Sequence, residues 1–429
     1  MAITAASRDT WREDTVRVVK EARRAASVVA NASTDQKNAA LRAMAKRIDG
    51  QRAAILAANA QDVQGAHREQ RPAAIIDRLT LTEKRVDEIV ASIHAVAQLA
   101  DPVGEVIRMW RRPNGLQIGK VRVPLGVVGI IYESRPNVTS ECASLCLKSG
   151  NAVVLRGGSE AWASNHALAA AIQSALVDAK LPAAAATLIP TPERAAVDVM
   201  LQMDREIDII IPRGGEELIR TVQRTSAIPV LAHDKGLCHT YVDEGADLTM
   251  AEEIAFNAKV ERPGVCNAME TLLVHEQVAP DFLPRMVRRL RESGVEVRGC
   301  PRTRALVPGI AAATEADWDT EYLDLILSVK VVGSFEEAVS HIAEHGSGLA
   351  EAIVTTDHSR AMRFLLEVDA GAVFVNASSR FTDGGEFGMG AEMGISTQKL
   401  HARGPVGLTE LTCQKFIVLG EGQVRDSRK

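Results

Sequence analysis

Cys266 is the residue of this chain whose surroundings best suit covalent chemistry. It follows a short loop, residues 262–264, and precedes a run patterned for burial, N-A-M-E-T-L-L-V-H. A partly exposed thiol that is fixed on backbone near N–H donors can react as a thiolate nucleophile. Most cysteines without a disulfide partner are instead small buried apolar residues, so this segment alone leaves both interpretations open.

Two turns that follow expected buried strands could bind phosphate groups. In I-I-I-P-R-G-G-E-E, Gly214 and Gly215 would open a helix, where backbone N–H groups and the helix dipole favour an anion. In V-V-L-R-G-G-S-E, Gly157 and Ser159 offer a similar turn, and Arg156 could pair with a ribose 2′-phosphate, which favours NADP over NAD. Each turn could also be a plain strand-to-helix connection, but two of them in one sheet favour a dinucleotide.

Polar residues also gather where other strands are expected to end. Asn137, fixed by Pro136, could donate to an oxygen that becomes anionic during attack on a carbonyl, although capping the next helix is the commoner role. Basic side chains could hold a carboxylate or phosphate with two hydrogen bonds, although each alone is more often a solvated surface residue. These are Arg135, Arg380 and Arg403.

The elements that must position these residues follow from hydrophobic periodicity. Residues 15–99 predict several amphipathic helices, the longest beginning after Thr34 and Asp35. Residues 107–123 change to period two around Asn114-Gly115, which predicts a protruding β-ribbon. Four short apolar runs then alternate with helical stretches up to residue 212. This alternation predicts βαβ units and a parallel sheet that binds ligands at the carboxyl ends of its strands.

A second α/β set is expected from residue 228 onward. Its strands would be I-P-V-L-A, C-H-T-Y-V-D, E-T-L-L-V-H, L-I-L-S-V-K-V-V, E-A-I-V-T-T and A-G-A-V-F-V-N. The terminal C-Q-K-F-I-V-L-G could pair with the β-ribbon, while the glycine spacing of residues 387–394 fits a structural loop rather than a dinucleotide motif. We therefore expect a cofactor-binding domain at 1–107 and 124–232, a catalytic domain at 233–410, a β-ribbon at 108–123 and 411–421, and a disordered tail at 422–429.

Composition limits the classes of function. The 429 residues are 46% apolar and carry a net charge of −5 without long runs of one sign. The absence of basic runs argues against nucleic acid or anionic lipid as a partner. The small number of aromatic residues, three Tyr, four Trp and eight Phe, also argues against stacking on nucleic-acid bases. The six cysteines lack zinc spacing, which predicts no metal site and reduced thiols in a cytoplasm. The sequence predicts neither export nor membrane spanning.

Taken in order, several blocks resemble the aldehyde dehydrogenase superfamily and, within it, the γ-glutamyl phosphate reductase family. The resemblance covers nearly the whole chain. It is carried by Y-E-S-R-P-N-V-T (132–139), C-H-T-Y-V-D (238–243), R-P-G-V-C-N-A-M-E-T-L-L-V (262–274), V-N-A-S-S-R-F-T-D-G-G-E-F-G-M-G-A-E (375–392) and S-T-Q-K-L-H-A-R-G-P (396–405). It implies two Rossmann-like α/β domains with parallel sheets, plus a small β flap that joins subunits of a homo-oligomer.

The resemblance also implies roles for single residues. Cys266 would be the catalytic thiolate and Asn137 the oxyanion donor, Gly214 and Gly215 would lie by the cofactor pyrophosphate, and Glu321 would contact the nicotinamide ribose. The implied reaction is the NADPH-dependent reduction of γ-glutamyl phosphate to glutamate 5-semialdehyde through a cysteine thioester, in proline biosynthesis. A γ-glutamyl kinase could deliver the substrate. The residues expected to orient the substrate are Arg135, Ser378, Arg380, Lys399, His401 and Arg403.

Two alternatives stay open at this stage. One is an acyl-CoA-forming or general aldehyde dehydrogenase. Leu231 argues against simple oxidation, because it stands where hydrolytic members of the superfamily carry a general-base glutamate. The other is a catalytically silent scaffold, against which the intact Cys266 segment argues. Leu349 and Ala350 leave the scaffold some room, because many relatives have a histidine and a hydroxyl residue there.

Overall fold

The computed structural model describes residues 6–233 and 235–425, which form two compact units. Unit 1 holds the described residues up to Leu231, Met389–Gly394 and the chain from Val406 on, and unit 2 holds Ala232–Gly388 and Ile395–Pro405. We expected residues 389–394 and 406–410 in the same domain as Cys266. They group with unit 1 because the Met393 N–H donates to the Val406 carbonyl (2.8 Å) and Gly390 lies against Leu99. Part of the expected tail, residues 426–429, lies outside the described residues.

Unit 1 is built on a parallel sheet whose strands run in the order β5-β4-β3-β6. Both β3 and β4 are buried along their whole length, as expected of continuous apolar runs that helices cover on both faces. The strands are β3 (Val127–Tyr132), β4 (Ala152–Gly157), β5 (Ala186–Leu188) and β6 (Ile209–Arg213). The helices between and after them are α6 (Asn137–Lys148), α7 (Trp162–Asp178), α8 (Ala195–Leu201) and α9 (Glu216–Thr225), with short 3-10 turns η1 (Ser159–Ala161) and η2 (Ala183–Ala185).

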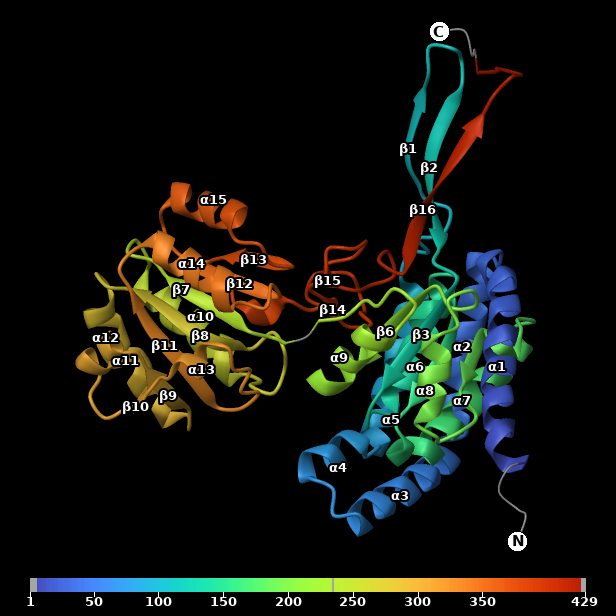
Figure 1. The fold of residues 1–429 in the computed structure, drawn as a ribbon, viewed down its shortest axis with the longest axis horizontal. Coiled ribbons are helices and arrows are strands. Elements are labelled where there is room, and N and C mark those ends of the chain that lie inside the picture. Colours follow the sequence, from blue (N-terminus) through green and yellow to red (C-terminus); the bar gives the residue numbers. More distant parts are fainter. Residues whose placement is uncertain (1–5, 234, 426–429) are drawn as a thin grey trace. The chain divides into compact units, whose positions relative to one another are not determined.

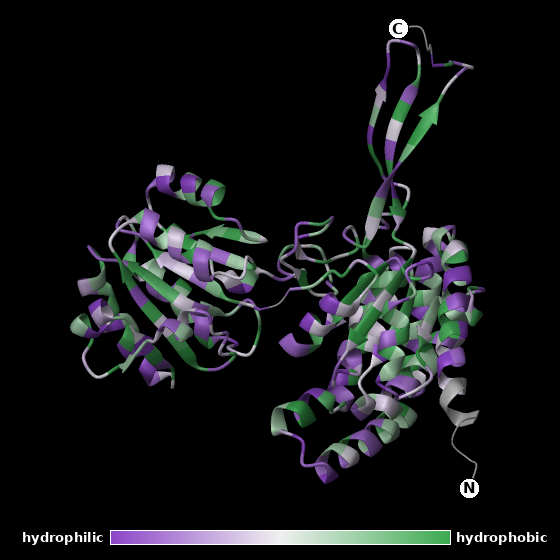
Figure 2. Ribbon diagram, in the orientation of Figure 1, coloured by the Kyte–Doolittle hydropathy of each residue, from purple (hydrophilic) through white to green (hydrophobic). Residues whose placement is uncertain are grey.

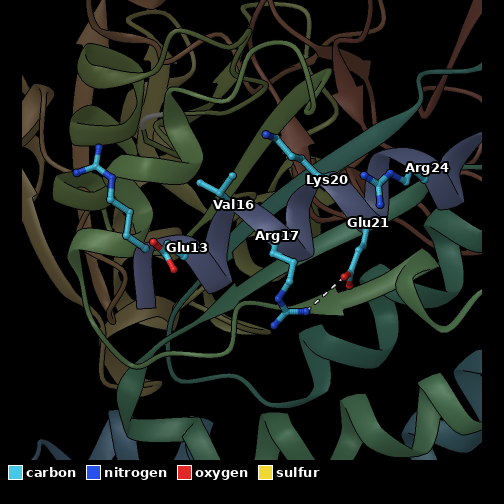
Figure 3. A pocket seen from close by; sticks show the side chains of 7 residues that line it. Glu13, Val16, Arg17, Lys20, Glu21 and Arg24 are labelled. Carbon is cyan, nitrogen blue, oxygen red and sulfur yellow. Dashed lines mark hydrogen bonds and ion pairs between the residues drawn. The ribbon is translucent and has the colours of Figure 1, made fainter. Parts of the chain in front are cut away.

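Five further helices precede this sheet: α1 (Ala6–Ala30), α2 (Thr34–Gly50), α3 (Arg52–Arg68), α4 (Ala73–Leu79) and α5 (Glu83–Gln98). The helix expected to begin after Thr34 and Asp35 is α2, which begins at Thr34 itself because Ser33 is its N-cap and accepts the Gln36 N–H. The prediction that this helix is the longest is wrong, because α1 has 25 residues and α2 has 17. An open depression on the charged face of α1 is shown in Figure 3, where Arg17 pairs with Glu21 (3.3 Å).

An antiparallel arm extends from unit 1 (Figure 1). It consists of β1 (Val106–Arg111), β2 (Gln117–Pro124) and β16 (Thr412–Leu419), in the order β1-β2-β16. Gly115 adopts a φ of +91° in the hairpin, a conformation that glycine accepts at no steric cost. The expected pairing of the terminal strand with the ribbon is confirmed, in register from Thr412 opposite Pro124 to Leu419 opposite Gln117.

Unit 2 holds a parallel sheet of seven strands in the order β10-β9-β11-β8-β7-β12-β13. The strands are β7 (Cys238–Val242), β8 (Met269–His275), β9 (Glu296–Gly299), β10 (Ala311–Ala312), β11 (Ile326–Val332), β12 (Ala350–Val354) and β13 (Ala372–Val375). The helices are α10 (Leu248–Val260), α11 (Ala279–Glu292), α12 (Pro301–Leu306), α13 (Glu315–Trp318), α14 (Phe335–His345) and α15 (His358–Glu367), with η3 (Ser379–Phe381) and a small β14 (Ile395–Ser396) and β15 (Gly404–Pro405) pair.

The apolar residues of unit 2 form separate cores on the two faces of its sheet. One core packs α10 and α11 against Leu272 and Val274, and the other packs α14 and α15 against Tyr241 and Leu273. This division follows from the alternation of side chains along each strand. In each unit the strands of the large parallel sheet are mostly apolar, whereas the helices carry both apolar and polar residues (Figure 2). In the part of the chain that the structure describes, no helix is long and apolar enough to cross a membrane.

The prediction of a strand at residues 228–232 in the second α/β set is wrong. The run I-P-V-L-A forms only a single bridge, from Val230 to Ile210 at the edge of the unit 1 sheet. Pro229 has no N–H to extend a ladder, and its carbonyl accepts the Ile210 N–H (2.9 Å) instead. The apolar pattern identified an extended segment but not the sheet to which it belongs.

Candidate functional site

Cys266 lies in the turn that joins α10 to β8 in unit 2, and its side chain is half-buried. It packs with Phe374 against a small apolar cluster made by Cys238, Leu349, Ala350, Ala372 and Ile395. Leu349 and Ala350 are fully buried in this cluster. Leu349 and Ala350, the two residues noted in the sequence as a departure from the family pattern, therefore place apolar side chains beside the cysteine.

The backbone of Gly236 passes directly against Cys266. A Cβ at position 236 would lie 2.0 Å from the carbonyl oxygen of Cys266 and 2.5 Å from its Cα, so no larger residue fits without a backbone shift. The thiol of Cys238 donates to the same carbonyl (3.3 Å). On the other side, the Gly236 N–H donates to the carboxylate of Glu321 (2.9 Å). Glu321 is thus fixed to the segment that supports the cysteine.

Asn267, the residue after the cysteine, is held by the segment that carries Ser378 and Arg380. Its side-chain amide donates to the carbonyls of Thr382 (2.9 Å) and Arg380 (3.3 Å). The guanidinium of Arg380 donates to the Asn267 side-chain oxygen and to the carboxylate of Glu261 (2.6 Å). Ser378 is buried and accepts the Arg380 N–H (3.3 Å). Both residues expected to bind substrate therefore lie beside the cysteine loop, and the Arg380 head group braces that loop.

The remaining expected substrate residues of unit 2 form a second group around Asp369. Arg403 bonds the Asp369 carboxylate (2.5 Å) and its carbonyl (3.0 Å), and Lys399 bonds the same carboxylate. Lys399 and then Arg403 hold the pKa of Asp369 below its ordinary value. His401 is exposed and lies between these two cations in the sequence. Within this group, the single carboxylate of Asp369 pairs with two cations, Lys399 and Arg403.

In unit 1, the turn of Gly214 and Gly215 connects β6 to α9 as expected. Gly215 is the N-cap of α9, and no described atom lies within 4 Å of the position its Cβ would take. Its N–H donates to the carboxylate of Glu133 (2.9 Å). The N-terminus of α9 therefore already binds one anionic group, the carboxylate of Glu133, as the helix dipole favours.

The neighbouring turn after β4 is arranged differently. Arg156 is 5% exposed, and its guanidinium donates to the carbonyls of Gly157, Pro192 (3.0 Å) and Glu193 (3.3 Å). Burial lowers the pKa of Arg156. Ser159 is exposed at the start of η1. The Arg156 head group thus lies against backbone carbonyls at the end of its strand.

Asn137 is the first residue of α6, and Arg135 lies exposed just before the helix. The N-cap position is Pro136, so the Asn137 amide does not cap the helix and instead donates to Glu141 one turn on (2.8 Å). A carboxamide carries two N–H donors, so the group can serve a second acceptor.

Sequence reasoning missed the charged partners that hold these side chains. Glu261, Asp369, Lys259 and Glu270 each pair with a residue in or beside the expected site. The signal for Glu270 was present, because it is a carboxylate inside the otherwise apolar strand M-E-T-L-L-V-H. Among the described residues, no group of three His, Cys, Asp or Glu side chains could hold a metal ion.

Comparisons with known proteins agree with the expected resemblance. The model of the aldehyde dehydrogenase family matches residues 2–305 and 314–415. A gamma-glutamyl phosphate reductase of Moorella thermoacetica is 56% identical over 406 residues, which cover 95% of this chain and 97% of the relative. One of Carboxydothermus hydrogenoformans is 54% identical over 96% of this chain and 100% of its own. The crystal structure of a gamma-glutamyl phosphate reductase from Thermotoga maritima matches with a TM-score of 0.95 at 50% identity, covering 96% of this chain and 100% of that one. The chain belongs to the aldehyde dehydrogenase family, among its gamma-glutamyl phosphate reductases.

Proposed function

We propose that this chain reduces γ-glutamyl phosphate to glutamate 5-semialdehyde with NADPH and releases phosphate, the second step of proline biosynthesis from glutamate. The observation that carries the proposal is the 56% identity over 95% of the chain to a relative named for this reaction. The half-buried thiol of Cys266, held on a braced loop, supports it because acyl transfer needs a fixed nucleophile.

In the proposed mechanism the sulfur of Cys266 attacks the acyl carbon, the bond to the phosphate oxygen breaks, and a γ-glutamyl thioester remains. The backbone N–H of Cys266 and the side-chain amide of Asn137 are the proposed donors to the oxyanion. A reduced nicotinamide, when bound, would supply the hydride that turns the thioester on Cys266 into a thiohemiacetal. Breakage of its C–S bond then frees the aldehyde and returns the electron pair to the sulfur as a thiolate.

Exclusion of water is the second task of the residues around Cys266. The thioester must persist until it is reduced, and the buried Leu349 and Ala350 keep one side of the sulfur apolar. In unit 1, Leu231 is buried too, and its side chain has no group that could activate water. These side chains favour reduction of the thioester over its hydrolysis.

For the cofactor, the family implies a nicotinamide dinucleotide, and the choice of NADP is our proposal. Gly214 and Gly215 would hold the pyrophosphate, Glu321 the nicotinamide ribose, and Arg156 with Gly157 and Ser159 the adenosine end. We expect Arg156→Gln to lower kcat/KM for NADP by about tenfold or more and to change the value for NAD much less. Equal losses with both cofactors would mean that Arg156 only braces the carbonyls of residues 157, 192 and 193. Arg47→Gln, which removes an arginine from a surface pair with Asp178, is the control.

Two sets of side chains would orient the anionic groups of the substrate. Ser378 and Arg380 lie beside the cysteine loop, and Lys399 and Arg403 share Asp369. Arg135 and His401 complete the proposed set. A γ-glutamyl kinase partner and a cytoplasmic location stay predictions from the sequence.

The proposal is tested with glutamate 5-semialdehyde, phosphate and NADP, following the formation of NADPH. We expect turnover that requires phosphate and falls at least about a thousandfold in Cys266→Ala. Cys413→Ala, which alters the exposed thiol of the arm, should keep wild-type activity. Turnover that needs CoA instead of phosphate would favour the acyl-CoA-forming alternative, and an active Cys266→Ala variant would remove the covalent step.

A further inference from the structure

A buried ion pair brackets the loop that carries Cys266. Lys259 lies near the end of α10 and Glu270 near the start of β8, so one partner stands at each end of the loop. Their charged atoms are 2.7 Å apart, and the side chains are 0% and 1% exposed. Two charges this deeply buried need each other, because either one left alone would be strongly destabilising.

We propose that Lys259 and Glu270 are positioning residues, which hold the Cys266 loop in register with the segment that carries Glu321. This inference rests on the proposed function, because the loop and the segment are those assigned to the nucleophile and the nicotinamide ribose. The pair acts through other groups and does not itself touch the reacting atoms.

The coupling runs through a short series of contacts within unit 2. One carboxylate oxygen of Glu270 bonds Lys259, and the other accepts the N–H of Leu323 (3.2 Å). Leu323 adopts a φ of +52°, so this hydrogen bond fixes a backbone conformation that leucine rarely takes. The same segment presents Glu321 to the Gly236 N–H, and Gly236 lies against the backbone of Cys266. Glu270 therefore fixes both the end of the cysteine loop and the segment that supports it.

The ionised pair is energetically costly, which argues for a role beyond stability. Burial raises the pKa of Glu270 to about 7, and Lys259 opposes that shift, while burial lowers the pKa of Lys259. The other charged or titratable groups that act on the pair are Glu321, Asp324 and Cys238, and Tyr322 presents its ring to Lys259 (5.9 Å). Since the folded-state pKa of Glu270 exceeds its ordinary value of 4.5, folding stability falls as pH rises from 4.5 to about 7 and the carboxyl ionises. An apolar pair of similar volume would avoid this cost.

The matched comparison is Glu270→Gln against Asp101→Asn. Asp101 forms a further buried pair with a lysine, Lys37, within unit 1 (2.6 Å). We expect both variants to melt roughly 10 °C lower, because each leaves a lysine without its carboxylate. Only Glu270→Gln should lower kcat, by about tenfold, with KM for the semialdehyde changed less than about threefold. It should also remove an ionisation near neutral pH from the acid side of the kcat profile.

Hydrogen–deuterium exchange of the protein without ligands tests the coupling independently of activity. Glu270→Gln should speed exchange in peptides that contain Gly236 and Leu323, and Asp101→Asn should not. Lys259→Met combined with Glu270→Gln should regain melting temperature and still lack the ionisation. A wild-type protein without reductase activity would refute the proposed function and leave the exchange comparison valid. If the Gly236 and Leu323 amides of Glu270→Gln exchange at the wild-type rate, the positioning role is overturned.

Discussion

At the scale of single residues, the nucleophile depends on a neighbour that has no side chain. Gly236 leaves the space in which the carbonyl and Cα of Cys266 lie, at 2.0 and 2.5 Å from where a Cβ would stand. Because these neighbours are backbone atoms, a methyl group there must displace the cysteine loop rather than a flexible side chain.

We therefore expect Gly236→Ala to lower kcat by about a hundredfold, since small displacements of a reacting group carry costs of that order. The control is Gly245→Ala in the same unit, where the nearest atom to an added Cβ is the Thr355 hydroxyl at an ordinary 3.6 Å. Steady-state kinetics and melting curves of both variants provide the measurement. A Gly236→Ala enzyme with wild-type kcat would show that the loop can shift without consequence.

The candidate nucleophile could be predicted from the sequence, but its supports could not. Cys266 stood out because a loop precedes it and a buried run follows it. Its contact with Gly236 and the link from Gly236 to Glu321 join segments far apart in the sequence, and no local pattern encodes them. The capping role that seemed commoner for Asn137 does not occur, because Pro136 takes the N-cap position.

At the scale of elements, α14 packs a histidine into unit 2 where a charge is strongly disfavoured. His341 is 4% exposed, and its Nδ1 accepts from the ammonium of Lys330 (3.0 Å). Burial first, and then His239, Lys330 and His345, lower the pKa of His341 to about 2. The folded protein thus keeps this ring neutral, whereas the unfolded chain protonates it below its ordinary pKa of 6.5.

His341 should therefore lower the free energy of unfolding as the solution is made more acidic. As pH falls from 7.5 to 5, we expect wild type to lose about 2 kcal/mol more unfolding free energy than His341→Gln, at roughly 1.4 kcal/mol per pH unit below 6.5. Urea unfolding across this range measures the difference. His358→Gln, at an exposed position of α15, should run parallel to wild type. Parallel curves for His341→Gln as well would refute the assignment.

Helices and strands could be predicted where a short stretch of sequence carries a clear hydrophobic pattern. The four strands of the parallel sheet in unit 1 were predicted from short apolar runs, and the hairpin from period-two alternation around Asn114-Gly115. Helix α11 and strand β9 were not anticipated, although α11 buries Phe282, Met286 and Leu290 on one face. Pro284 lies inside the helix and its solvated face carries many arginines, so the sequence of α11 does not look like that of a regular helix. Strand order depends on long-range pairing, and hydrophobic pattern alone does not specify it.

At the scale of the whole molecule, the arm exposes large apolar side chains that nothing in unit 1 covers among the described residues. Phe416 and Val418 of β16 share one face and are 60% and 56% exposed, and Trp110 of β1 meets Phe416 edge to face at 6.3 Å. In a monomer, a three-stranded sheet with large exposed apolar side chains would leave apolar surface and unpaired strand edges in water. Such surfaces tend to associate with another chain. We propose that a second copy of the chain covers this arm in a homo-oligomer.

Charges placed on the exposed face of the arm test this assembly. We expect Phe416→Asp combined with Val418→Asp to convert an oligomer into a monomer, since a carboxylate buried in an apolar interface without a partner is strongly disfavoured. Light scattering coupled to size-exclusion chromatography gives the mass of each species. Val177→Asp on α7, at a similarly exposed apolar position (60%), is the control and should keep the wild-type mass. The arm of the double variant must stay folded for the result to count, and the near-ultraviolet signal of Trp110 reports on it. An unchanged oligomer with a folded arm would place the subunit contact elsewhere on the molecule.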